Sequence, residues 1–573
     1  MSRFTSRGFE TDRWDVPRWW TREVTLFRRC PPSITGEIAW QNQRVSTATA
    51  ATSTGTSPAK GGLVLAALIL AAGVANMNLS IANVALPEIG RDLGASQVGL
   101  NLVAVGFSLG LSISVLYLGA LGDRYGRKLM LVLGLALGIP AAILASLSNS
   151  VELLTAARIL GGIAAGMAYP TTLALITALW KGPGRTRAIA LWSALGAALS
   201  AISPVAAGAL MLTAPWQYAF LIPIPLGIVA LILVLKLVPG KVNESDEPVD
   251  HAGGVLSAIF LGGLVLGINF AALDGQFGVV AVCFAITLSG GILFFWREKR
   301  AAFPIFDLSF AKRRTFWVAA LSGIIVFGSL MGAMFVGMQF LQNVLGYNTL
   351  ASGFAIIPCV LAMVVAAPFS SRMVERWGSK HTLLFGFAFI FMGFASMLVL
   401  WGIHTTYWVV GISYALIGIG VGIAGTPASH ALTDSVPVAK VGMASGTGDL
   451  QRDLGGAVMQ SIMGAILGAG YTAAIAKTLA NEPANVKSQI SAQIHDALTK
   501  SFGSAVDLAS KYPQYKTQIV QAAQQSFLEG ANWAYLTGIV AMLLGAALVW
   551  FFFPTRERER ALYRDWGTEN SEA

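Results

Sequence analysis

Long runs of apolar residues, separated by short polar turns, occupy most of this chain. A run of about 20 apolar residues is long enough to cross a lipid bilayer as a helix. Fourteen such runs are present, at residues 62–87, 98–121, 129–149, 152–178, 188–212, 216–235, 252–272, 277–296, 315–341, 350–371, 381–401, 406–433, 441–470 and 531–553. The pattern therefore predicts an all-α membrane protein with fourteen transmembrane helices.

The composition agrees with a membrane protein. The chain is 55% hydrophobic and 12% charged, whereas a typical soluble domain is about 25% charged. The net charge of +10 follows from loop positions: with a cytoplasmic N-terminus, the short inside loops hold 18 Lys and Arg and the short outside loops hold only Arg91. This bias predicts a multi-pass protein with both termini in the cytoplasm. It also removes most of the case for binding nucleic acid.

Three segments lie outside the predicted spans. Residues 1–61 form a basic tail and a low-complexity linker, which is either disordered or rests on an anionic membrane surface. In residues 471–530, Ile494, Leu498 and Phe502 recur every four residues, which predicts an extracytoplasmic helical hairpin. The hairpin is either a passive cap or has a role in gating or partner binding. Residues 554–573 form a cytoplasmic tail.

The turn after the second span carries the most informative motif, Gly119-Ala-Leu-Gly-Asp-Arg-Tyr-Gly-Arg-Lys128. Its glycines permit a tight turn, and its cations suit a cytoplasmic membrane surface. The motif resembles the signature between the second and third helices of the major facilitator superfamily, which are secondary transporters. We expect a conformational latch here, formed by Gly119, Asp123, Arg124, Gly126, Arg127 and Lys128, with Glu375 in a weaker copy after the tenth span.

The end of the first span, Asn78-Leu-Ser-Ile-Ala-Asn-Val-Ala-Leu-Pro87, resembles the first-helix signature of the fourteen-helix drug–proton antiporters. That resemblance implies two six-helix bundles, residues 62–238 and 315–553, with two inserted helices at 252–296. It also implies alternating access. Asn78 stands where the family has an acid, and an amide cannot carry a proton.

Two further motifs match the same family in part. Arg158 opens the segment Arg158-Ile-Leu-Gly-Gly-Ile-Ala-Ala-Gly166, and a cation inside a bilayer is a functional candidate. Its alternatives are an outward-snorkelling side chain or a structural bond to carbonyl groups. In the fifth span, small residues recur every four positions and resemble the antiporter packing motif: Gly196, Ser200, Pro204 and Gly208.

The thirteenth span differs most from the family pattern. The segment Ala444-Ser-Gly-Thr-Gly-Asp-Leu-Gln-Arg-Asp-Leu-Gly-Gly456 matches it, but Asp449 replaces an Asn and Asp453 is additional. On a helix Asp449, Asp453 and Gln460 share one face, with Arg452 beside it. We expect proton coupling at Asp449 or Asp453, with Arg452 and Arg158 as further candidates. The alternative is a permanent Asp–Arg–Asp network that joins two helices.

The function predicted by these resemblances is export of drugs or amphipathic small molecules against protons across a bacterial cytoplasmic (inner) membrane, by a monomer. Candidate substrate contacts are the polar groups Asn78, Gln339, Gln342 and Gln460, although Gln342 can equally serve backbone groups. The alternatives are a lipid, sugar or metabolite carrier or uniporter, and a non-transporting sensor or scaffold. We expect no enzyme activity, cofactor, disulfide or metal site, because the His and Cys residues are few and scattered.

Overall fold

The computed structural model describes residues 60–180, 182–240, 248–271, 277–436, 441–481 and 492–572. The predicted basic tail lies outside the described residues up to position 59. The regular elements of the described ranges are helices, and twelve helical stretches there are long and apolar enough to cross a membrane. The predicted all-helical membrane fold is confirmed.

The helices follow the predicted apolar runs in order. The first eight runs become α2 (Gly61–Asp92), α3 (Gln97–Tyr125), α4 (Arg127–Ser146), α5 (Val151–Leu179), α6 (Gly182–Leu210), η2 with α7 (Trp216–Leu221 and Pro223–Leu237), α8 (His251–Phe270) and α9 (Phe277–Glu298). After the short α10 (Leu308–Ala311) come α11 (Arg314–Asn343), α12 (Thr349–Ala355), α13 (Ile357–Leu400), α14 (Tyr407–Asp434), α15 (Val441–Asn481) and α19 (Lys516–Phe552).

One of the twelve stretches holds two predicted spans. Residues 349–400 form a single stretch, but Gly378 interrupts it with a φ of 82°. Glycine adopts such a positive φ without a steric penalty, so the chain turns there. The predicted spans 350–371 and 381–401 lie on the two sides of this turn. With these two arms and α6, each of the fourteen predicted runs has its helix among the described residues.

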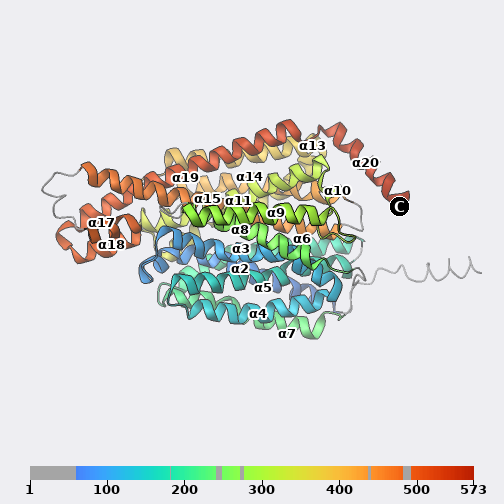
Figure 1. The fold of residues 1–573 in the computed structure, drawn as a ribbon, viewed down its shortest axis with the longest axis horizontal. Coiled ribbons are helices and arrows are strands. Elements are labelled where there is room, and N and C mark those ends of the chain that lie inside the picture. Colours follow the sequence, from blue (N-terminus) through green and yellow to red (C-terminus); the bar gives the residue numbers. More distant parts are fainter. Residues whose placement is uncertain are drawn as a thin grey trace, which may run out of the picture. The chain divides into compact units, whose positions relative to one another are not determined.

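The transmembrane helices form two groups and an inserted pair (Figure 1). Helices α2 to α7 pack on one another, and α11 to α15 pack together with α19. The groups meet where α3 contacts α15 and α6 contacts α12. Helices α8 and α9 pack together, and α8 also contacts α3 and α15. The inserted pair therefore lies beside the seam between the two groups.

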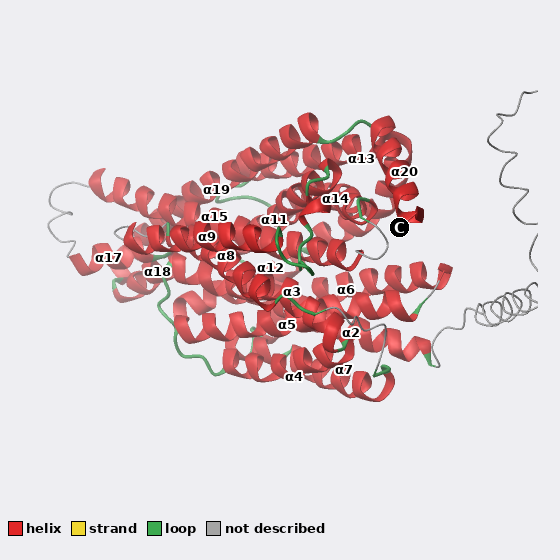
Figure 2. Ribbon diagram, turned by 45° about the vertical axis from the view of Figure 1, so that its right-hand side comes forward, coloured by secondary structure: helices red, strands yellow, loops and turns green. Residues whose placement is uncertain are grey.

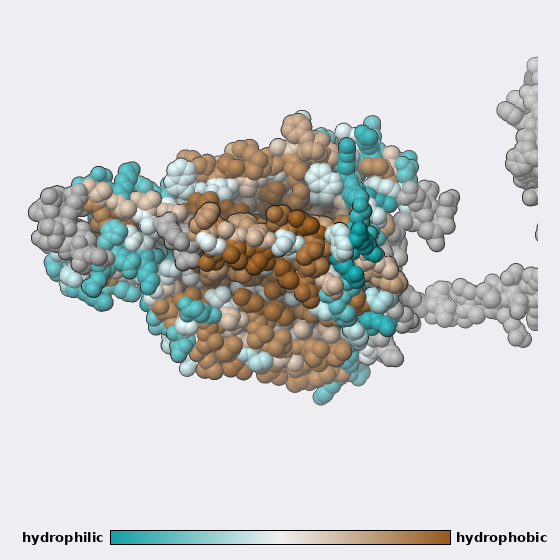
Figure 3. Space-filling model, in the orientation of Figure 1, coloured by the Kyte–Doolittle hydropathy of each residue, from teal (hydrophilic) through white to brown (hydrophobic). Residues whose placement is uncertain are grey.

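Apolar side chains cover the outer face of the helices between two hydrophilic ends (Figure 3). Large apolar side chains on the outer surface of the helices are strongly exposed, for example Leu288 at 66%, Val365 at 62% and Phe551 at 76%. So wide an apolar surface is unfavourable in water. Helices also satisfy their backbone hydrogen bonds internally, as the bilayer interior requires. The apolar surface between the two hydrophilic ends is therefore the lipid-facing surface of a membrane protein.

The described part of the segment 471–530 is helical, but the two adjacent transmembrane helices extend into this segment from both sides. Helix α15 continues to Asn481 and α19 already begins at Lys516; α17 (Ala492–Lys500), α18 (Phe502–Lys511) and η4 (Pro513–Tyr515) lie between them. The buried side chains of Leu498 and Phe527 anchor this part, and the Phe502 and Phe527 rings are 6.2 Å apart. Helix α18 packs against α2 and α19. The limits of this segment as a separate domain stay a prediction.

The two groups of helices differ in spacing along their length. They lie close together toward the end that carries α17 and α18, and they spread apart toward the end that carries α20 (Arg556–Glu572) (Figure 2). Gln97 of α3 donates to Gln339 of α11 at 3.0 Å, which joins the groups at the narrow end.

Candidate functional site

Helix α15 carries three charged side chains between its apolar neighbours. Asp449 and Asp453 lie about one helical turn apart, and each is only 6% exposed. Arg452 Nη1 lies 3.8 Å from Asp449 Oδ1, an ion pair too long for a good hydrogen bond. Water nevertheless reaches 36% of the Arg452 side chain. The structure thus brings the three predicted charges together beside a water-accessible space.

Tyr169 of α5 completes this charged centre. Arg452 Nη1 donates a hydrogen bond of 2.7 Å to the Tyr169 hydroxyl, which joins the two groups of helices. The guanidinium also lies 5.2 Å from the centre of the Phe327 ring, a favourable contact for a cation. Sequence reasoning missed Tyr169. Its only signal was a hydroxyl within an apolar span, directly before Pro170.

Polar side chains continue along α15 beyond the charged centre. Gln460 is 1% exposed, and its Oε1 has no hydrogen-bond partner among the described residues. Next to it, Ser461 accepts a bond of 2.6 Å from Asn269 of α8, whose Oδ1 accepts one of 2.5 Å from Asn101 of α3. This polar junction joins both groups of helices to the inserted pair.

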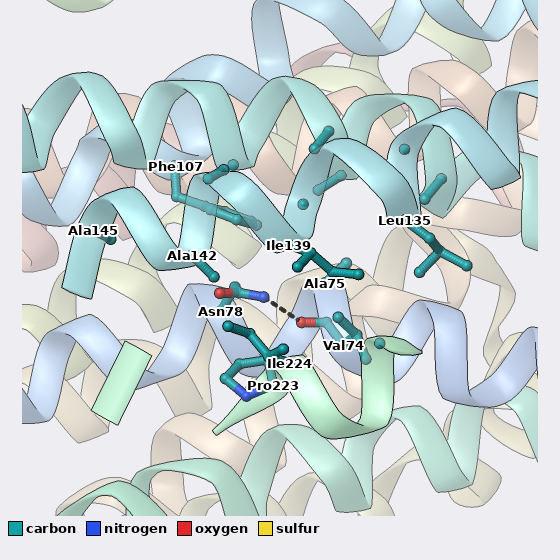
Figure 4. A pocket seen from close by; sticks show the side chains of 18 of the residues that line it. Val74, Ala75, Asn78, Phe107, Leu135, Ile139, Ala142, Ala145, Pro223 and Ile224 are labelled. Atoms are coloured by element: carbon teal, nitrogen blue, oxygen red, sulfur yellow. Dashed lines mark hydrogen bonds between the residues drawn. The ribbon is translucent and has the colours of Figure 1, made fainter. Parts of the chain in front are cut away.

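Asn78 and Arg158 meet inside the first group of helices. Arg158 is 2% exposed, and its Nη1 donates to the main-chain oxygen of Asn78 at 2.5 Å. The Asn78 amide nitrogen in turn donates to the main-chain oxygen of Val74 at 2.9 Å (Figure 4). The contact therefore runs through the backbone of Asn78 and not through its amide. Both side chains border a small cavity between α2, α4, α5 and α7.

The two glutamines at the end of α11 contact the other group of helices. Gln339 is fully buried and accepts the bond from Gln97. Gln342 Nε2 donates a hydrogen bond of 2.9 Å to the main-chain oxygen of Val84 in α2. In this conformation both side chains join the two groups of helices.

The small residues of α6 allow close packing. Ser200 Oγ lies 3.1 Å from Ser80 Oγ of α2, and a methyl group at Gly196 would be in ordinary van der Waals contact with the Asn76 side chain at 3.7 Å. A side chain at Gly208 would collide with the main chain at Thr349 of α12, and Pro204 lies against the same helix. The stripe therefore packs α6 against both α2 and α12.

The residues of the predicted latch bond within the first group of helices. Arg127 forms an ion pair of 2.9 Å with Asp123 and donates to the main-chain oxygen of Ala174 in α5 at 3.3 Å. Lys128 caps the end of α7, where it donates to two main-chain oxygens at 3.0 and 2.6 Å. Gly126, with a φ of 119°, makes the turn between α3 and α4.

The other latch candidates are Gly119, Arg124 and Glu375. Gly119 has open space around it, and Arg124 lies in the last turn of α3. Glu375 contributes its main-chain oxygen, which accepts bonds from Arg556 and Arg560 of α20 at 2.7 and 3.1 Å. In the second group of helices, the position of Glu375 on α13 is thus a point where α20 docks.

The charged centre offers ion pairing and proton exchange as its chemistry. Among the described residues, no three His, Cys, Asp or Glu side chains gather where they could hold a metal ion. The geometry instead places two carboxylates, a guanidinium and a phenol at the contact between two groups of helices. Such an arrangement changes when the groups move relative to each other.

Comparison with known proteins places this geometry in a family. The model of the Major Facilitator Superfamily matches residues 68–460. The chain is 29% identical to the multidrug resistance protein Stp of Mycobacterium tuberculosis (strain CDC 1551 / Oshkosh), over 66% of this chain and 70% of that protein. It is 30% identical to the multidrug efflux pump LfrA of Mycolicibacterium smegmatis (strain ATCC 700084 / mc(2)155), over 71% of this chain and 81% of the pump.

A solved structure supports the same fold. A bacterial homologue of the human lysosomal transporter Spinster, in an inward-facing and occupied conformation, superimposes with a TM-score of 0.57. The alignment covers 88% of this chain and 99% of the homologue at 16% identity, so it supports the fold alone. With the matched family model and these relatives, the chain belongs to the Major Facilitator Superfamily, a family of membrane transporters.

Proposed function

We propose that this protein exports drugs or other amphipathic small molecules by alternating access, with protons moving in the opposite direction. The observation that carries the proposal is the charged centre formed by Asp449, Arg452 and Asp453 with Tyr169. It lies where the two groups of helices meet, which is where transporters of this architecture bind substrates and coupling ions. The names of the relatives Stp and LfrA support drugs as the substrate class.

Asp453 is the strongest candidate for the proton-carrying group. It is 6% exposed, and its Oδ2 has no hydrogen-bond partner among the described residues. A charged carboxylate in an apolar surrounding is costly, and either a nearby cation or a bound proton removes that cost. Arg452 pairs more directly with Asp449. In our proposal Asp453 gains its proton in one conformation and loses it in the other.

The other predicted residues take supporting roles in this proposal. Gln339 and Gln342 close the narrow end of the structure, which becomes the external end in the predicted topology. The ion pair of Asp123 and Arg127 stabilises one conformation at the cytoplasmic end and changes its bonds in the other. The charge bias of the loops supports a cytoplasmic-membrane protein with both termini inside the cell.

Gln460 is our candidate for a substrate contact. Its Oε1 is buried without a partner among the described residues, so a donor group of a substrate can satisfy it. Asn78 is a weaker candidate, because its amide nitrogen is already bonded to the backbone.

A uniporter is the second candidate function, and one observation favours it. Asn78 replaces the acid of the antiporter signature, and its amide cannot exchange a proton. In that case Asp449, Arg452 and Asp453 form a permanent ion network that stabilises α15. Transport would then run down the substrate gradient alone.

Dye efflux from proteoliposomes with an imposed pH gradient separates these functions. The comparison uses the native chain, Asp449→Asn, Asp453→Asn and, as a matched control, Asp507→Asn on the exposed face of α18. We expect native and control efflux to follow the gradient, and efflux by Asp453→Asn to lose that dependence. Native efflux that ignores the gradient would establish the uniporter. Equal gradient dependence in all four proteins would exclude α15 as the coupling element.

A further inference from the structure

Arg158 is a buried cation surrounded by neutral groups. Its Nη1 and Nε donate to the main-chain oxygens of Asn78 and Val103 at 2.5 and 3.3 Å. The rings of Phe107 and Phe220 lie 4.9 and 5.9 Å from the guanidinium carbon. None of these neighbours carries a negative charge, and none of the described carboxylates forms an ion pair with Arg158.

Part of the guanidinium also lacks a hydrogen-bond partner. Nη2 is buried and has none among the described residues. A buried charge without a counter-charge destabilises the fold, and an unused buried donor destabilises it further. The side chain is 2% exposed, so bulk water does not offset these costs. Something that is both negative and able to accept hydrogen bonds would remove them.

A cavity lies beside this side chain. It has a volume of about 40 Å³ and is bordered by α2, α4, α5 and α7. Figure 4 shows Asn78 at its edge among the apolar side chains of Ala142, Ile139 and Ile224. On this measure of volume, about 10–15 Å³ is enough to hold one water molecule. The cavity thus has room for a small ion of the size of chloride.

We propose that a single small monovalent anion of the size of chloride binds in this cavity against the Arg158 guanidinium. The anion takes the place of the carboxylate that the antiporter signature has at position 78. A water molecule would satisfy Nη2 but would leave the positive charge uncompensated. The site lies within the first group of helices, so the proposal does not depend on proton coupling through α15.

The amide at Asn78 provides a direct test. We expect the purified full chain in detergent to bind one equivalent of radiolabelled chloride. Asn78→Asp places a fixed carboxylate beside Arg158, and Arg158→Gln removes the cation, so we expect both variants to lose this binding. Asn348→Asp is the matched control, because position 348 is a helix N-cap where aspartate serves as well as asparagine. We expect it to bind chloride as the native chain does.

Thermal unfolding gives a second, independent measurement. The native chain should show a saturable rise in Tm when chloride replaces gluconate at constant ionic strength, because gluconate is too large for the cavity. Asn78→Asp should unfold at the same temperature in both salts. The proposal is overturned if the native chain binds no chloride, or if Asn78→Asp binds it as well as the native chain. Should Arg158→Gln fail to fold, Asn78→Asp still decides between these outcomes.

Discussion

A single hydroxyl group connects the charged centre to the other half of the molecule. Tyr169 accepts the bond of 2.7 Å from Arg452, and Arg452 lies 3.8 Å from Asp449. The longer distance shows that the phenol, more than the carboxylate, fixes the position of the guanidinium. A hydrogen bond to a charged group contributes about 1.5–3 kcal/mol. The alignment of the carboxylates with Arg452 therefore depends on α5.

Removal of that hydroxyl should impair transport more than folding. Tyr169→Phe keeps the ring, which packs 5.6 Å from Trp192, and loses the hydroxyl that accepts the bond from Arg452 and also lies against the Asn76 side chain. We expect gradient-driven efflux to fall about tenfold, which corresponds to about 1.4 kcal/mol. Tyr117→Phe is the control. The Tyr117 hydroxyl forms a hydrogen bond with His251, and these two residues lie on α3 and α8, not on the helices of the charged centre. Equal efflux by native chain and Tyr169→Phe would show that the phenol does not orient the site.

Local spacing was enough to predict part of the site. Asp449 and Asp453 are four residues apart, and helical geometry alone places them on one face. Tyr169 is 283 positions away from Arg452, and nothing in the sequence pairs two distant spans. The predicted topology places Asn78 and Arg158 in the outer halves of their spans, so it was possible to infer that they lie close together. Their bond through a main-chain oxygen was not, because it depends on the exact rotation of α2 and α5.

At the scale of helices, apolar length decided most of the fold. Every predicted run became a helix, because the runs are long enough to cross a bilayer and backbone groups there must bond internally. The helix ends were less predictable. Helix α15 continues to Asn481, through residues 471–481 that the sequence analysis assigned to the insertion. The docking of α20 was also missed, since it depends on single hydrogen bonds to α13.

Close contact between α3 and α5 depends on a glycine. A methyl group at Gly162 would lie 2.8 Å from the main-chain nitrogen of Leu111 and would also meet the Phe107 main chain. We expect Gly162→Ala to destabilise the fold by about 1–3 kcal/mol, the usual effect of overpacking. Gly119→Ala is the control, because nothing lies within 4 Å of its added methyl group. Tm values in detergent test this, and equal values for both variants would contradict it.

The attachment of α20 should depend on pH. Glu559 is 5% exposed, and its Oε2 accepts a bond of 3.2 Å from the main-chain nitrogen of Ser379. Burial raises the pKa of Glu559 above its usual value of about 4.3. The docked state therefore binds the proton more tightly than the free helix does. The free energy that this difference in pKa adds to docking is fully present below about pH 4.3. It is lost as the pH rises through the raised pKa of Glu559.

Distances between spin labels on α13 and α20 measure this effect. We expect the docked population to be larger at pH 5 than at pH 8. Glu559→Gln keeps a neutral side chain at every pH, so its docked population should not change. Asp434 and Tyr563 are the other titratable groups near Glu559, and they are unchanged in this comparison. A docked population of the native chain that is constant with pH would show that Glu559 does not control the attachment.

At the scale of the whole molecule, the structure represents one state of a transport cycle. Gln97 and Gln339 join the two groups at the narrow end. The Thr349 hydroxyl of α12 donates a hydrogen bond of 2.8 Å to the main-chain oxygen of Gly208 in α6, which also joins the two groups. The ion pair of Asp123 at the opposite end stays within its own group. Alternating access requires that the contacts at the narrow end break during each cycle.

Covalent closure of the narrow end should therefore stop transport. Gln97→Cys and Gln339→Cys, introduced together after replacement of the native cysteines, place two thiols where the side chains are bonded at 3.0 Å. We expect a short, reducible bifunctional thiol reagent to bring efflux to background and a reductant to restore it. Each single variant, treated in the same way, should transport normally, since one thiol cannot join the groups. Because the bond between the groups is the only difference, undiminished efflux by the cross-linked protein would mean that the narrow end does not open during transport.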